Sequence, residues 1–271
     1  MEAQHKMYGE AFTPAQIAER VTEMGVTKAK ADALTLLVLA FMAGVYIALG
    51  AMLYTVVITD TGLGFGFTRL IGGLSFCLGL ILVVIGGAEL FTGNNLLAMA
   101  WAGNYITTKE LLRNWLIVYT GNIFGAVAVA FAIYWAGTFE MTNGKVGENL
   151  VQIASTKTSL TFSTGFIRGV LCNTLVCLAV WLAMGGRSVT DKILAIIFPI
   201  SAFVTMGFEH SVANWFFLPI GLLLDEGNTI TANGIMSNLF SVTLGNIAGG
   251  SLLVAGIYKI AYLRQNKKKS T

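Results

Sequence analysis

Long apolar stretches alternate with short polar segments along most of the chain. A helix needs about 20 residues to cross the hydrocarbon core of a bilayer. The apolar stretches approach or exceed that length, at about residues 34–58, 70–101, 115–135, 160–184, 193–224 and 235–260. Carboxylates interrupt two of them, at Glu89 and at Glu209. The pattern predicts an all-α membrane protein with six membrane-crossing segments.

A shorter amphipathic segment precedes the first of these stretches. Thr13 is suited to cap a helix and Pro14 to occupy its first turn. Ile17, Val21 and Met24 then recur at helical spacing, with charged residues between them. We expect a short helix outside the membrane core, which serves as a packing lid or as a gate.

The composition excludes several classes of protein. Hydrophobic residues make up 55% of the chain and charged residues 11%, with a mean hydropathy of +0.73, whereas soluble domains carry about 25% charged residues. The net charge of +3 forms no basic patch with interleaved aromatic residues, so we expect no nucleic-acid partner. The three cysteines lie in apolar runs without metal-ligand spacing, so we expect no metal site, cofactor or disulfide.

Lysine and arginine are concentrated on one side of the predicted membrane. Thirteen lie on the side of both termini, and only three on the other side: Arg69, Lys145 and Lys157. Because cytoplasmic loops are rich in these cations, we expect a multi-pass protein of the bacterial plasma membrane with both termini in the cytoplasm. The expected divisions are a cytoplasmic segment at 1–32, a transmembrane domain at 33–262 and a basic cytoplasmic tail at 263–271.

Three pairs of motifs recur in consistent order, about 120–125 positions apart. They are found at residues 41–45 and 166–170, 87–94 and 207–214, and 121–125 and 245–249. Spans one to three therefore repeat as spans four to six. Because three is odd, the second half must enter the membrane from the opposite face, which makes a 3+3 inverted repeat typical of channels and transporters. We place repeat one at about 33–137 and repeat two at about 158–262.

Glu89 and Glu209 lie at matching positions inside the second and fifth spans. A charge in the hydrocarbon core costs at least about 2.5–3.5 kcal/mol. Gly87 and Gly207 precede them and allow the chain to bend. We predict that both spans are broken helices whose halves meet near the midplane. The two glutamates are interpreted as clamps on freed backbone N–H groups; direct contact with a substrate is the alternative.

His210 is the only histidine outside the N-terminal tail, and its counterpart in the first repeat is Leu90. Because an unperturbed histidine titrates near pH 6.5, we predict a proton donor in a pore; a hydrogen-bonded core residue is the alternative. Arg168 is expected to pair with a carboxylate or to extend its charge to the interface. Lys157 by itself is interpreted as a surface lysine.

Other polar and apolar residues lie near the predicted breaks. Asn122 and Asn246 are flanked by glycine, which predicts tight helix crossings, and Asn173 is a further intramembrane polar group. Phe76, Leu80 and Phe203 lie within about one to four helical turns of the breaks; they either pack towards lipid or form a hydrophobic constriction.

These motifs resemble the formate/nitrite transporter family over about residues 29–264. The resemblance is strongest at 88–93, 173–181 and 207–214. It implies an aquaporin-like protomer, assembly as a homopentamer and one substrate pore in each protomer. Residues 78–82 and 186–192 resemble the formate-channel branch.

The resemblance also implies roles for particular residues. Leu90 and Phe203 would form a cytoplasmic constriction, and Phe76 and Leu80 a periplasmic ring. A central site and proton relay would be formed by His210, Thr92 and Asn173, with Lys157 near the outer mouth. A supporting hydrogen-bond network would comprise Glu89, Glu209, Asn214, Asn122 and Asn246.

The function expected from these features and this resemblance is transport of formate and related small monovalent anions, with His210 protonating the anion in a dry lumen. Nitrite or hydrosulfide is the alternative substrate within the same family. A membrane enzyme is not favoured, because no nucleophile motif, metal cluster or cofactor fingerprint occurs. A water or glycerol pore is not favoured, because the paired Asn-Pro-Ala motifs of aquaporins do not occur.

Overall fold

A computed structural model describes residues 11–264 of the protein, and the regular secondary structure of this part of the chain consists of helices alone. The α-helices are α1 (Pro14–Lys30), α2 (Ala33–Ile58), α3 (Phe65–Gly86), α4 (Phe91–Asn94), α5 (Ala98–Ala102), α6 (Thr108–Trp135), α7 (Lys145–Thr158), α8 (Phe162–Gly185), α9 (Val189–Thr205), α10 (Ser211–Leu224) and α11 (Ala232–Ala248). Short 3₁₀ turns lie at Asn95–Leu97 and Thr138–Glu140, and α11 continues as π-helical turns at Gly249–Gly256 and Lys259–Leu263.

The helices account for the predicted membrane crossings. Within the described residues, five are long and apolar enough to cross a bilayer: α2, α3, α6, α8 and the continuous helix from Ala232 to Leu263. The remaining predicted crossing is divided between α9 and α10, which are shorter. The prediction of an all-α membrane protein is confirmed. The predicted features at residues 1–10 and 265–271, including the basic end of the tail, lie outside the described residues.

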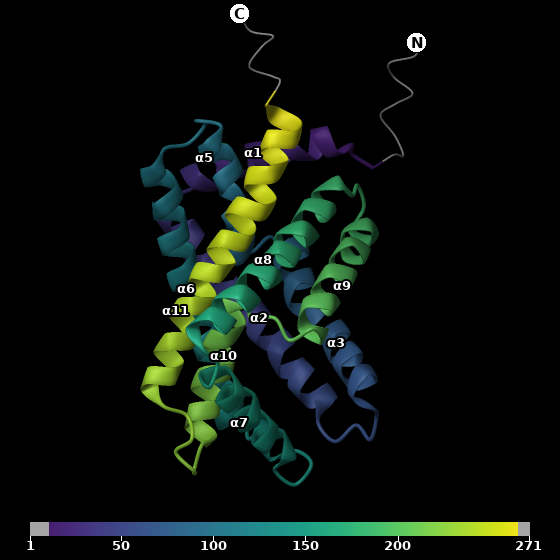
Figure 1. The fold of residues 1–271 in the computed structure, drawn as a ribbon, viewed down its shortest axis with the longest axis vertical. Helices are drawn as coiled ribbons and strands as arrows, with labels where there is room; N and C mark the ends of the chain where they lie inside the picture. Colours follow the sequence, from purple (N-terminus) through teal and green to yellow (C-terminus); the bar gives the residue numbers. More distant parts are fainter. Residues whose placement is uncertain (1–10, 265–271) are drawn as a thin grey trace, which may run out of the picture.

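Two amphipathic helices lie at opposite ends of the molecule (Figure 1). α1 begins as predicted, since the Thr13 hydroxyl accepts the Gln16 N–H and Pro14 occupies the first turn. Ile17 and Val21 of α1 pack into one cluster with Val254, so α1 covers the end at which α11 finishes. α7, which was not predicted, packs against α10 at the other end. Each precedes one of the repeats, and their opposite placement agrees with inverted repeats.

Tight glycine crossings hold each repeat together. A Cβ atom on Gly125 of α6 would overlap the Phe41 carbonyl oxygen of α2. In the second repeat, a Cβ on Gly245 of α11 would overlap the Phe166 carbonyl oxygen of α8. No side chain fits at either position, because the two backbones are in contact there. The crossings predicted around Asn122 and Asn246 are therefore confirmed.

The second and fifth spans are both broken, as predicted. Gly87, the C-cap residue directly after α3, has φ of +77°, and Gly207, two residues after α9, has φ of +74°; this is the left-handed region that favours glycine. The chain then runs extended through Leu90 and His210, which are the N-cap residues of α4 and α10. Each break thus leaves backbone groups without helical partners in the interior of the protein.

Candidate functional site

A buried polar network surrounds the first break. Lys28 of α1 places its ammonium 3.1 Å from a Glu89 oxygen. The Asn94 side-chain amide donates to the other Glu89 oxygen at 2.7 Å and to the side-chain oxygen of Asn114 at 3.0 Å. Asn114 in turn donates to the Lys28 carbonyl at 3.1 Å. The charge of Glu89 is therefore balanced by a lysine from outside the membrane core.

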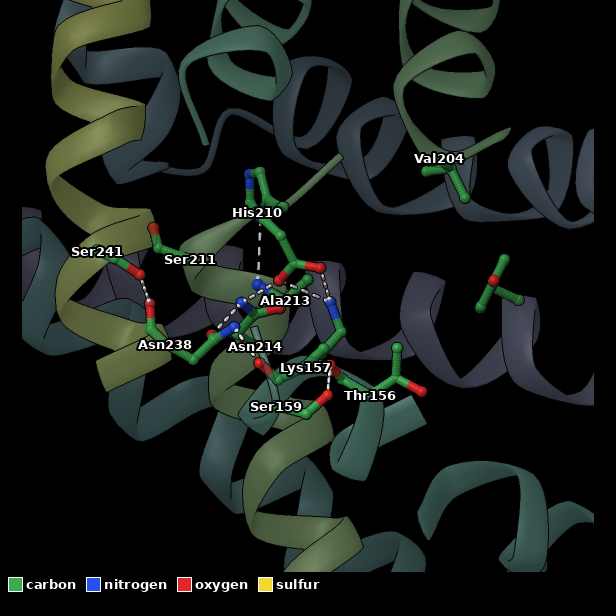
Figure 2. A network of polar contacts seen from close by, with 12 residues as sticks. Thr156, Lys157, Ser159, Val204, His210, Ser211, Ala213, Asn214, Asn238 and Ser241 are labelled. Carbon is green, nitrogen blue, oxygen red and sulfur yellow. Dashed lines mark hydrogen bonds and ion pairs between the residues drawn. The ribbon is translucent and has the colours of Figure 1, made fainter. Parts of the chain in front are cut away.

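The same network is built a second time around the other break (Figure 2). Lys157 of α7 places its ammonium 3.0 Å from both oxygens of Glu209. Asn214 donates to Glu209 at 2.8 Å and to Asn238 at 2.7 Å, and Asn238 donates to the Lys157 carbonyl at 2.9 Å. The lysine, the glutamate and both asparagines correspond, although Lys28 also donates to the side-chain oxygen of Asn94 at 3.0 Å, a contact with no counterpart around Glu209. α1 and α7 therefore hold equivalent positions in the two halves.

Asparagines, and not the glutamates, satisfy the freed backbone groups. Asn122 accepts the Phe91 N–H at 2.8 Å and donates to the carbonyls of Ala40 and Glu89. Asn246 accepts the Ser211 N–H at 2.9 Å and donates to the carbonyls of Gly169 and Glu209 in the same way. The prediction that the glutamate side chains clamp backbone N–H groups was wrong, because those carboxylates are occupied by lysine and asparagine side chains.

His210 lies at the centre of the protein and is 3% exposed. Its Nδ1 accepts the Ala213 N–H at 3.1 Å, as the cap of α10, and its Nε2 lies 2.9 Å from Thr92 Oγ1. Since Nδ1 accepts a hydrogen bond, a neutral ring carries its hydrogen on Nε2 and donates it to Thr92. A second proton would have to enter at Nδ1 and displace the Ala213 N–H. The Phe203 ring stacks on the imidazole, with centroids 6.0 Å apart.

Asn173 lies behind this pair. Its amide donates to the carbonyls of Thr92 and Asn246 and to the side chain of Asn95, at 2.7–3.2 Å. Both Asn173 and Thr92 are fully buried. The structure therefore brings Thr92 and His210 into contact, as the resemblance implied, and uses Asn173 to hold the backbone that carries Thr92.

Two cavities approach the centre from opposite sides. The α7-side cavity has a volume of about 250 Å³, and its lining includes Lys157, Phe203 and His210. The α1-side cavity has a volume of about 210 Å³, and its lining includes Lys28 and Leu90. His210 is therefore open to a lumen, which the transport interpretation requires.

The four apolar residues predicted at the constrictions are paired differently from the expectation. Phe76 and Phe203 both line the α7-side cavity, with ring centroids 5.7 Å apart at 82°. Leu80 and Leu90 both line the α1-side cavity. The reason is the direction of α3, which starts at the α7 end of the molecule, so Phe76 lies one helical turn nearer that end than Leu80.

The residue-based interpretation of Lys157 as a surface lysine was wrong. Its side chain is only 13% exposed, because α7 turns it inwards towards Glu209. A periodic signal was present, since Val146, Leu150 and Ala154 recur at intervals of four and form the buried face of α7. Lys28 was missed for another reason: its partner is 61 residues away in sequence, and only the fold brings the two together.

Comparison with known proteins decides the family. The model of the family described as "Formate/nitrite transporter" matches residues 15–260. The chain belongs to the formate/nitrite transporter family. A member from Escherichia coli (strain K12), "Formate channel FocA", is 40% identical, with 93% of this chain and 95% of the relative aligned. The "Probable formate transporter" of Methanothermobacter thermautotrophicus is 39% identical, with 95% and 100% aligned.

Solved structures of family members share the fold. A structure described as "Pentameric formate channel with formate bound" is 40% identical, with a TM-score of 0.80, 86% of this chain and 98% of that chain covered. An "FNT family ion channel" is 30% identical with a TM-score of 0.84, covering 91% and 98%. An aquaglyceroporin from Plasmodium falciparum, at 15% identity and a TM-score of 0.55 over 84% of this chain and 100% of that chain, shares the fold alone. The aquaporin-like architecture is thus confirmed for this multi-pass membrane protein.

Proposed function

We propose that this chain is a channel that carries formate, and related small monovalent anions, across a bacterial plasma membrane. The observation that supports this function best is the pair of cavities that reach the centre from opposite sides, with a histidine in the lining of the α7-side cavity. Relatives named as formate channels are 40% identical over nearly the whole chain. Assembly as a homopentamer follows by analogy with the pentameric relative. The excess of lysine and arginine on the α1 side supports a cytoplasmic location for that side.

Charge at the two cavities draws the anion in, and apolar side chains then oppose its passage. Cations outnumber carboxylates in the lining of both cavities: Arg69, Lys157 and Arg168 against Glu209 on the α7 side, and Lys28 and Lys192 against Glu89 on the α1 side. Beyond them lie Phe76 and Phe203 on one side and Leu80 and Leu90 on the other. A bare carboxylate that loses its water there bears a large desolvation cost. Formic acid, which is neutral, passes the same apolar side chains at a much lower desolvation cost.

His210 is the proposed proton donor. The neutral ring donates its Nε2 hydrogen to Thr92, so a full proton transfer requires that the ring first becomes an imidazolium. The second proton enters at Nδ1 when the Ala213 contact opens. The imidazolium then passes one proton to the formate oxygen and returns to its neutral form. Transport by this route is coupled to a small movement at the start of α10.

Uptake of labelled formate, nitrite and hydrosulfide into proteoliposomes in parallel, with glycerol as a neutral control, tests the function. We expect saturable formate uptake that rises as the outside pH falls. Glycerol uptake at the rate of formate, with no pH dependence, would show that the chain is a neutral-solute pore. Faster uptake of nitrite or hydrosulfide than of formate would reassign the substrate.

Two variants at His210 separate its proton role from its structural role. In His210→Asn, the amide oxygen can still cap α10, because asparagine is among the best N-cap residues. In His210→Ala, both the cap and the titrating group are lost. We expect His210→Asn to keep the stability of the parent and to lose the pH dependence of formate uptake. Unchanged pH dependence in His210→Asn would refute proton donation by the imidazole.

A further inference from the structure

In the α7-side cavity, cations outnumber carboxylates, and the cations differ in whether their side chains already have partners within the protein. Four of them line it: three cations, Arg69, Lys157 and Arg168, and one carboxylate, Glu209. The ion pair with both oxygens of Glu209 occupies Lys157. The cavity therefore holds more positive charge than its own carboxylate balances.

Arg69 is also occupied. Its guanidinium donates to the Val204 carbonyl at 2.6 Å and to the Thr205 carbonyl at 3.1 Å, which are orphan acceptors at the end of α9. A third nitrogen donates to the Tyr54 hydroxyl at 2.7 Å. Arg69 thus caps the broken helix and joins α3 to α9, and each of its three side-chain nitrogens already donates one hydrogen bond within the protein.

Arg168 differs from both. Its backbone carbonyl accepts the Glu209 N–H at 3.3 Å, so its position on α8 is level with the break. Its half-buried side chain lines the cavity. Neither a hydrogen bond nor an ion pair is formed by its guanidinium with any part of residues 11–264. The sequence suggested pairing with a carboxylate, and no carboxylate of the described chain takes that place.

The first repeat shows that the scaffold does not require an arginine at this position. There the Glu89 N–H donates to the Leu39 carbonyl at 3.2 Å, which is the contact equivalent to that of Arg168. The counterpart of Arg168 is therefore Leu39, so the expected pairing of residues 41–45 with 166–170 was wrong by four positions; the contacts of Asn122 with Ala40 and of Asn246 with Gly169 give the same register. Leucine therefore performs the same backbone task. The guanidinium of Arg168 is an addition to one cavity of the pair, and the α1-side cavity has no arginine among the described residues that line it.

We propose that Arg168 is the carboxylate-recognition residue of the α7-side cavity. The planar guanidinium presents parallel N–H groups that match two oxygens on one atom, which a lysine ammonium does not. Formate and nitrite both have this geometry; hydrosulfide, with a single heavy atom, does not. Arg168 thus binds the anion through two parallel hydrogen bonds, before the anion moves on to His210. This inference rests on the proposed function, because it names how that same pathway selects its substrate.

The test compares two anions in Arg168→Lys and Arg168→Leu. Lysine keeps the charge and loses the paired geometry, while leucine copies the first repeat. Initial uptake rates of formate and hydrosulfide, supplied from the α7 side of proteoliposomes, give the half-saturating concentration and the maximal rate of each. Lys145→Met is the matched control, since Lys145 is an exposed cation of the same end whose side chain does not line the cavity.

We expect Arg168→Lys to raise the half-saturating concentration of formate about tenfold, the loss of one charge-assisted hydrogen bond, with the maximal rate unchanged. Hydrosulfide uptake is expected to change less than about twofold. Arg168→Leu should raise the half-saturating concentration of formate at least as much. Lys145→Met should leave the uptake of both anions unchanged. Equal losses for formate and hydrosulfide in Arg168→Lys, or no change for either, overturn the inference. If the unaltered protein carries no formate, it is the proposed function that fails.

Discussion

The buried ion pair between Lys157 and Glu209 gives a prediction whose size follows from its surroundings. The two side chains are 13% and 6% exposed, and Asn214 is a further donor to the carboxylate. Removal of one partner of a buried pair leaves an uncompensated charge and typically costs about 3–5 kcal/mol. At about 2–4 °C per kcal/mol for a chain of this size, Glu209→Gln is expected to lower the unfolding temperature by roughly 6–20 °C.

A double-mutant cycle separates the ion pair from the rest of the network. Lys157→Met leaves Glu209 charged and unpaired, and it should destabilise the protein as much as Glu209→Gln does. The double variant contains neither charge, and the amide oxygen introduced by Glu209→Gln can still accept the Asn214 hydrogen bond. We therefore expect the double variant to be more stable than either single variant. The measurement is thermal unfolding of the protein in detergent.

An exposed pair of the same chemistry is the control. Lys145 lies 2.7 Å from Asp60, and the two side chains are 51% and 53% exposed. Exposed pairs contribute about 0–1 kcal/mol, so Lys145→Met should shift the unfolding temperature by no more than a few degrees. Unfolding temperatures that fall additively in the cycle of Lys157 and Glu209 would refute the reasoning, because they would show that the two charges act independently.

Three further outcomes are expected. Gly245→Ala should lower the unfolding temperature in the same assay by at least the equivalent of about 1–3 kcal/mol, because the added Cβ would overlap a carbonyl oxygen of α8. Gly66→Ala is the control and should leave the unfolding temperature unchanged, because a Cβ there meets open space. Phe203→Ala should widen the α7-side constriction and raise formate leakage at neutral pH in proteoliposomes; an unchanged rate would place the barrier elsewhere. A membrane-impermeant maleimide should label Lys145→Cys in intact cells and Thr27→Cys only after permeabilisation, and the opposite result would invert the topology.

The membrane class and the repeat were determined by the sequence alone. Apolar length and scarce charge are properties of composition, and a bilayer leaves helices and closed barrels as the only solutions. The glutamates at matching positions revealed the two breaks, because a charge at that depth needs a structural reason. The resemblance to a family then brought Thr92 and His210 together, and the structure places their side chains 2.9 Å apart.

Only the tertiary structure decided which groups are partners. Lys28 and Glu89 lie on different helices far apart in sequence, and no pattern along the chain specifies their contact. The pairing of Phe76 with Phe203 depends on the direction in which α3 approaches the break, which hydrophobicity does not encode. Arg168 shows the same limit. Its position within an apolar span indicated a charge that needs a partner, and only the packed chain shows that none of the described residues pairs with its guanidinium. Contacts between distant segments arise from how whole helices cross, and local composition does not carry that information.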